Sequence, residues 1–113
     1  MPKSVPRTYS NYAQEAVALL AKLIRASRLE RKISAQELAE RAGISRGMLQ
    51  RIEKADMKCS IGAVFELASI LGITLFEADG TSLSRQLKQT QEKLTLLPKK
   101  ARKPAVKAVD DDF

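Results

Sequence analysis

Histidine is absent from this chain of 113 residues, and cysteine occurs once, at Cys59. One cysteine excludes an intramolecular disulfide, and without histidine a zinc site is not expected. Catalytic Cys–His and Ser–His pairs are excluded for the same reason. We therefore expect no catalytic residue, no metal and no cofactor, and a protein that is not an enzyme. Cys59 is interpreted as a small apolar residue in a reducing compartment.

Aromatic residues are scarce, at 4%, so the core must be built from Leu, Ile, Val and Ala. Hydrophobic residues make up 44% of the chain, which suffices for one small domain. No apolar run approaches the roughly 20 residues that span a bilayer. The amino end also lacks the charged-then-apolar order of a signal peptide. These absences predict a cytoplasmic protein with no membrane-spanning segment.

The charge is mainly of one sign, with 20 Lys and Arg against 13 Asp and Glu, for a formal net charge of +7. A surplus of this size favours a polyanionic partner, either nucleic acid or an anionic membrane. The same surplus also simply keeps a protein soluble, so the charge alone does not decide between these interpretations.

Hydrophobic periodicity predicts an all-α fold that follows a loose N-terminal arm, residues 1–9. Ser10 caps a first helix that runs to about Arg31. The apolar positions of this helix recur at spacings of three and four. They are Tyr12, Ala13, Ala16, Val17, Leu20, Leu23 and Ile24.

A second helix begins at Ser34, which forms a capping box with Glu37, and ends at Gly43. Its inner face is Leu38, Ala39 and Ala42. Ser45 caps a third helix that runs to about Lys54. A fourth helix lies between Ser60 and Gly72, and its inner stripe is Val64, Leu67, Ala68 and Leu71.

Beyond the fourth helix, ITLFEAD (73–79) fits either a short strand or a short fifth helix. TSLSRQLKQTQEKLTLL predicts a further helix that Pro98 stops. PKKARKPAVKAVDDDF (98–113) cannot bury a core, so we expect it to be disordered. The expected organisation is a helical domain over 10–79, a C-terminal helix over 80–97 and this tail.

The second and third helices meet at Gly43, with one helix before and another after, which is the layout of a helix-turn-helix. Ile44, Leu49 and Ile52 are expected to fill the space between the two helices. The opposite side of the third helix forms an arc of about 140° that has no apolar residue. It carries Arg46, Gly47, Gln50 and Arg51.

These residue types suit the major groove of DNA. Arginine can bond guanine O6 and N7, and glutamine can bond adenine, so we expect Arg46, Gln50 and Arg51 to read bases. Gly47 lets the helix approach closely, at a cost of about 1 kcal/mol in helix stability. The phosphate contacts are expected from Ser45, Arg41 and Lys54. Met48 either touches a thymine methyl or covers the edge of the core, and we favour the core. The alternative for the whole face is a solvated helix surface.

Residues 24–72 resemble the helix-turn-helix domain of the Xre family, the lambda-repressor-like and Cro-like regulators. The resemblance rests on Ile24 and Arg28, ISAQELAERAGIS, LQRIEK and SIGAVFELASILGI. It implies an all-α, lambda-repressor-like bundle of about five helices with an extra C-terminal helix, and a transcriptional repressor. It also implies a partly buried ion pair between Arg28 and Glu53, which would otherwise be an ordinary surface pair.

The chain departs from the family pattern at two positions. Lys32 stands where the family often has glycine. Ala35 stands where the family often has a glutamine that meets a phosphate, and Gln36 or Arg41 is expected to replace that contact.

Outside this domain, the long first helix, LGITLFEAD, LLPKKARKP and the DDDF segment resemble HipB-type antitoxins. These are regulators encoded beside a HipA-type kinase toxin. The resemblance implies that the tail is a ligand for the toxin, with the ring of Phe113 in an apolar pocket and Asp110, Asp111 and Asp112 at its basic rim. The alternative is an inert acidic segment that aids solubility.

We expect a homodimer on double-stranded, palindromic operator DNA. Spare leucines lie along the C-terminal helix at Leu83, Leu87, Leu94 and Leu97, and with Thr90 between them the steps are four, three, four and three residues. They span fewer than three heptads, so the helix could instead fold back on its own domain. Two other functions stay open: a stand-alone Xre-family repressor without a toxin, and an interaction module whose basic face binds a protein or an anionic surface.

Overall fold

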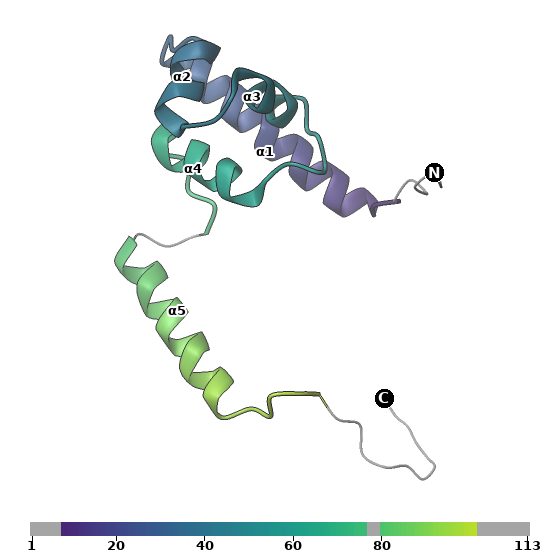
Figure 1. Cartoon of the computed structure of the whole chain (residues 1–113), viewed down its shortest axis with the longest axis vertical. Helices are drawn as coiled ribbons and strands as arrows, with labels where there is room; N and C mark the ends of the chain where they lie inside the picture. The colour runs from purple at the N-terminus through teal and green to yellow at the C-terminus, as the bar shows by residue number, and fades with distance from the viewer. Residues whose placement is uncertain (1–7, 77–79, 102–113) are drawn as a thin grey trace. The chain divides into compact units, whose positions relative to one another are not determined.

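The computed structural model describes residues 8–76 and 80–101 and contains five helices and no strand in those residues (Figure 1). They are α1 (Asn11–Glu30), α2 (Ala35–Ala42), α3 (Arg46–Glu53), α4 (Ile61–Leu71) and α5 (Gly80–Thr95). The chain divides into two compact units, Met1–Leu75 and Phe76–Phe113. The prediction of an all-α fold is confirmed. None of the helices in the described ranges is long and apolar enough to cross a membrane.

Each of the first four helices begins at a serine whose hydroxyl oxygen accepts a hydrogen bond from the backbone N–H three residues later. The four bonds are Ala13 N to Ser10, Glu37 N to Ser34, Met48 N to Ser45 and Ala63 N to Ser60, at 3.0–3.4 Å. All four predicted caps are confirmed. The capping box at Ser34 is only half formed, because the Glu37 carboxylate accepts from Arg41 at 2.7 Å instead of returning to Ser34.

The same four helices also end alike, with one residue in the left-handed region that favours glycine. Two of these residues are Gly43 (φ 70°) and Gly72 (φ 74°), as predicted. The other two are Lys32 (φ 57°), at the end of α1, and Ala55 (φ 64°), at the end of α3. At each end, the next backbone N–H bonds the carbonyl five residues back, at 2.8–3.1 Å. Lys32 therefore occupies a position that its backbone makes suitable for glycine.

The core of the first unit is aliphatic and takes at least one large side chain from every one of its helices. The largest fully buried side chains are Ile24, Leu38, Leu49, Leu67 and Leu71. α2 packs against α3 and α4, and α1 packs against the same two helices. The predicted inner positions of α2 and α4 are confirmed, with Ala42 and Val64 half-buried at the edge.

The predicted inner face of α1 is wrong in part. Tyr12, Ala16 and Leu23 are exposed, whereas Ala21 and Ile24 are buried. The reason is that α1 has two apolar stripes, and the exposed one lies about 100° around the helix from Ile24. Spacing alone did not distinguish the stripe that faces the core from the stripe that does not.

The second unit offers no buried side chain among residues 81–101. Its leucines on α5 are all exposed, including Leu83, Leu87 and Leu94. Residues 73–76 form neither the short strand nor the short fifth helix considered above, and 77–79 lie outside the described residues. The five helices of the described residues therefore include the C-terminal helix α5, and four helices precede it. Asp110, Asp111, Asp112 and Phe113 also lie outside the described residues.

Candidate nucleic-acid interface

The turn between α2 and α3 fixes how α3 is presented. Gly43 takes the left-handed conformation, and the backbone N–H of Ile44 bonds the carbonyl of Ala39 at 3.0 Å. Leu49 and Ile52 of α3 are buried, and Ile44 and Met48 pack half-buried against the same core. Met48 therefore covers the edge of the core, as predicted. One side of α3 is held inward and the other is left to solvent.

The outward side of α3 consists of Arg46, Gly47, Gln50 and Arg51, and all four are exposed. Glu53 is the one carboxylate in α3, and its side chain is only 7% exposed because it turns toward α1. The outward side of α3 thus bears two guanidinium groups and an amide without a competing acid. That combination suits an anionic ligand with base edges to read.

Gly47 is not required by the fold. It does not adopt a positive φ, and a Cβ built there would lie 3.8 Å from Arg51 Nη1 and 3.9 Å from Ser45 Oγ, which are ordinary contacts. A glycine inside a helix costs about 1 kcal/mol relative to alanine. The fold therefore does not explain why a glycine stands at position 47. The explanation that is left is that a ligand outside the protein approaches the helix closely there.

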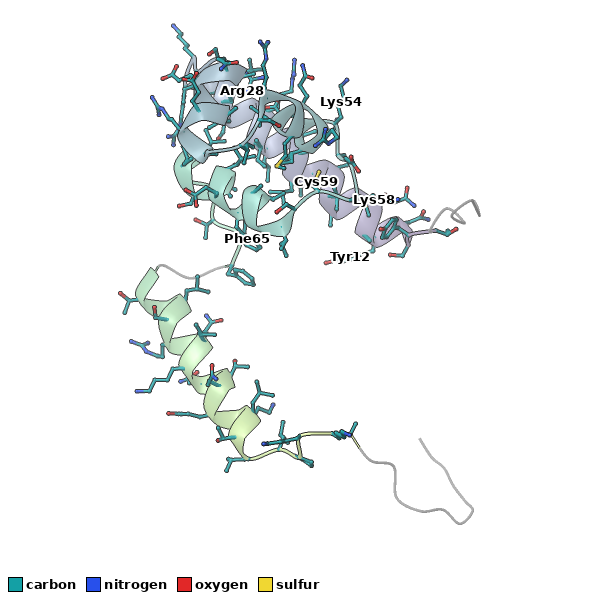
Figure 2. The ribbon with its side chains drawn as sticks, viewed as in Figure 1. Tyr12, Arg28, Lys54, Lys58, Cys59 and Phe65 are labelled. Atoms are coloured by element: carbon teal, nitrogen blue, oxygen red, sulfur yellow. The ribbon has the colours of Figure 1, made fainter. Side chains whose placement is uncertain are left out.

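The residues expected to hold phosphates differ in whether their side chains already bond an acidic neighbour. Lys54 is exposed directly after α3, as Figure 2 shows, and the Ser45 hydroxyl can still donate while its oxygen caps the helix. Arg41 donates to Glu37 at 2.7 Å, and the Gln36 amide donates to Glu40 at 2.9 Å. Arg41 and Gln36 would have to exchange these exposed partners for phosphate, at a cost of about 0–1 kcal/mol each.

The structure brings Arg28 and Glu53 together behind this face. Arg28 donates from Nε to Glu53 Oε2 at 2.8 Å and from Nη2 to Oε1 at 3.1 Å, and its Nη1 donates to the Ile33 carbonyl at 3.1 Å. The hydrogen bond to Glu53 raises the pKa of Arg28 above its usual value, although burial opposes the shift. Sequence reasoning missed Arg25, whose Nη1 lies 3.7 Å from the same carboxylate, one turn before Arg28.

Cys59 lies in the connection between α3 and α4, half-buried against the core (Figure 2). Burial raises the pKa of its thiol, the Asp56 carboxylate raises it further, and Arg51 partly offsets both. The thiol is therefore neutral near pH 7, in keeping with its interpretation as a small apolar residue.

Four packed helices with an exposed, basic third helix define a helix-turn-helix domain, the class of domain that serves DNA-binding regulators. Residues 24–77 match the model of the family described as Helix-turn-helix, HTH_3, which includes Xre and lambda-repressor-like domains. The match begins at the buried Ile24 and covers α2, α3 and α4, which confirms the helix-turn-helix resemblance over that segment. No curated protein matches the chain.

Proposed function

We propose that the protein is a transcriptional repressor that binds a palindromic operator as a homodimer, with α3 in the major groove. The observation that carries this proposal is the outward side of α3, which combines two arginines, a glutamine and a glycine that the fold does not require. The domain match over residues 24–77 supports the same reading.

The roles follow from the chemistry of each side chain. Arg46, Gln50 and Arg51 read base edges, and Gly47 gives the helix the clearance to reach them. Ser45 and Lys54, at the two ends of α3, hold phosphates and set the position of the helix. Arg41 and Gln36 extend the phosphate contacts from α2 once they release their acidic neighbours.

A homodimer fits the small reach of one helix. A single recognition helix covers only a few base pairs, and two-fold regulators place their half-sites about 34–36 Å apart or at a multiple of that distance. The exposed leucines of α5, which form one stripe, support a role of that helix in pairing. Light scattering at micromolar concentration tests the dimer, and a monomeric mass would count against it.

Selection of bound sites from random DNA tests the proposed specificity. We expect a two-fold sequence whose affinity falls steeply with salt, because phosphate contacts release counterions. The test variant is Arg46→Ala, which should weaken the sequence preference at one base pair of each half-site. Binding without sequence preference would instead favour an interaction module with a basic face.

We further propose that the repressor is the antitoxin of a HipA-type kinase toxin. The resemblance of LGITLFEAD, LLPKKARKP and the DDDF segment to HipB-type antitoxins supports this step. In this proposal Asp110, Asp111, Asp112 and Phe113 contact the toxin. Deleting residues 110–113 should leave operator binding unchanged while weakening toxin binding, as measured by calorimetry on a co-purified kinase. Equal affinity with and without Phe113 would remove the tail from the proposal.

A further inference from the structure

The helix α1 carries a second apolar stripe that its own domain does not cover. We define this outer stripe as Tyr12, Ala16, Leu19, Leu23 and Ala26, which step by four, three, four and three residues. All five are exposed, with Tyr12 at 83%, Leu19 at 59% and Leu23 at 43%. Scattered apolar residues on a surface need no explanation, but five in a heptad pattern along one helix face do.

We propose that the outer stripe pairs with the outer stripe of a second copy of this chain, with the two α1 helices antiparallel about a two-fold axis. The axis passes between residues 17 and 18 of each copy. Tyr12 of one copy then meets Leu23 of the other, and the small Ala16 meets the larger Leu19. Each contact occurs twice, so the face is complementary to itself, as a two-fold interface requires.

Two charged residues beside the stripe favour a second copy as the occupant. Glu15 and Lys22 lie along the same edge of the outer stripe, on the side away from the core. Both are exposed, and among residues 8–76 neither takes part in an ion pair. In antiparallel pairing the same edge of each helix meets, so Glu15 of one copy lies opposite Lys22 of the other, twice.

The same charges disfavour the other alignments. Sliding the pair by one heptad in one direction brings Glu15 opposite Glu15, and sliding it in the other direction brings Lys22 opposite Lys22. In parallel pairing this edge meets the core-facing edge of its partner, where Leu20 stands and no charge does. Unlike charges meet only in the centred, antiparallel alignment, which is how flanking charges specify register in paired helices.

The test uses charge reversal in the full chain. Leu87→Asp, on α5, is included in every protein so that any pairing through α5 does not mask the effect. A short two-helix contact is expected to be weak, so self-association is measured by sedimentation equilibrium at a high concentration, roughly 100 μM. Dimers of this parent should be detected there. Glu15→Lys and Lys22→Glu should each weaken self-association about tenfold, since each change brings like charges together twice.

The mixture of the two variants is decisive. Glu15→Lys supplies only basic edges and Lys22→Glu only acidic ones, so an equimolar mixture should associate within about threefold of the parent. Leu19→Asp should abolish association while the far-UV spectrum remains helical, and Glu66→Lys on α4 is the charge-matched control that should change nothing. A monomeric parent, an unaffected Leu19→Asp variant, or a mixture no tighter than its components would each overturn the proposal.

Discussion

Glu53, the last residue of α3, accepts two hydrogen bonds from Arg28 of α1, at 2.8 and 3.1 Å. The two side chains are 7% and 9% exposed, so the pair is nearly withdrawn from water. Arg28 uses its remaining nitrogen to bond the Ile33 carbonyl, in the turn after α1. One guanidinium group therefore joins the end of α3, the last turn of α1 and the turn that leads to α2.

Removing one member of this pair should be costly. Glu53→Leu leaves a buried guanidinium without its counter-ion, and the free energy of unfolding should fall by about 3–5 kcal/mol. The double variant Arg28→Met/Glu53→Leu should recover most of that loss, because no uncompensated charge remains. Urea denaturation measures both. Arg25→Ala is the control: its side chain is 59% exposed, and its loss should cost below about 1 kcal/mol.

The left-handed residues at the four helix ends allow a matched comparison, because two are glycines and two are not. Ala55→Gly relieves a left-handed alanine and should raise the free energy of unfolding by up to about 1 kcal/mol. Gly43→Ala should lower it by a similar amount, although a Cβ there meets nothing within 4 Å. Lys32→Gly should behave as Ala55→Gly does. Chemical denaturation that showed no gain for either new glycine would contradict the argument.

Gly47 should separate stability from DNA binding. Gly47→Ala should stabilise the free protein by up to about 1 kcal/mol, because the added Cβ makes only ordinary contacts. The same change should weaken operator binding, and Gly47→Leu should abolish specific binding while the far-UV spectrum stays helical. Thermal unfolding and a DNA-binding titration on the same preparations measure both effects. Undiminished operator affinity in Gly47→Leu would refute the close-approach explanation.

Base readers and phosphate holders should differ in what their loss changes. Gln50→Ala should cost about 1–3 kcal/mol on the operator and relax the preference at one base pair. Lys54→Ala should weaken all DNA sequences similarly and reduce the salt slope by about one. Binding measured on operator and random DNA at several salt concentrations distinguishes the two. If Arg46→Ala and Gln50→Ala both leave operator preference intact, another face of the protein contacts the bases.

Cys59 should react slowly with iodoacetamide near neutral pH, with a midpoint at higher pH than in the urea-unfolded chain. Burial raises its thiol pKa, and Asp56→Asn should bring the midpoint down while Arg51→Ala should raise it. Above the ordinary thiol pKa of about 8.5, the unfolded chain binds fewer protons than the folded one. The contribution of this group to the free energy of unfolding therefore declines as pH rises beyond that value. A lower midpoint in the folded protein would contradict the burial argument.

Local chemistry made much of the fold predictable. The serine caps and Gly43 depend on contacts within one turn, so the sequence indicated them directly. The side of α1 that faces the core was not predictable, because Tyr12 and Leu23 have the same spacing as Ile24 and its neighbours. The left-handed conformation of Ala55 was also missed, since alanine gives no signal for it.

Within the candidate site, the outward side of α3 could be predicted because its polar residues stand opposite Leu49 and Ile52. The pairing of Gln36 with Glu40 could not, because several exposed polar partners lie within reach on one short helix. Arg25 was missed because its contact with Glu53 joins residues far apart in the sequence and, unlike the contact of Arg28, is not implied by the family resemblance. Which exposed partner a long side chain selects depends on three-dimensional placement rather than on spacing.

α1 contacts both α3 and α4 and, near its end, holds Glu53 through Arg28. The outer stripe begins on the same helix, at Tyr12. A tilt of α3 on DNA that was transmitted along α1 would reach the face where a second copy would bind. Thermodynamic reciprocity then sets a strict rule: if operator DNA tightens the pairing of copies by some factor, pairing must tighten DNA binding by that same factor. Arg28 is the side chain that joins the end of α3 to α1, so this coupling factor should fall when Arg28 is replaced.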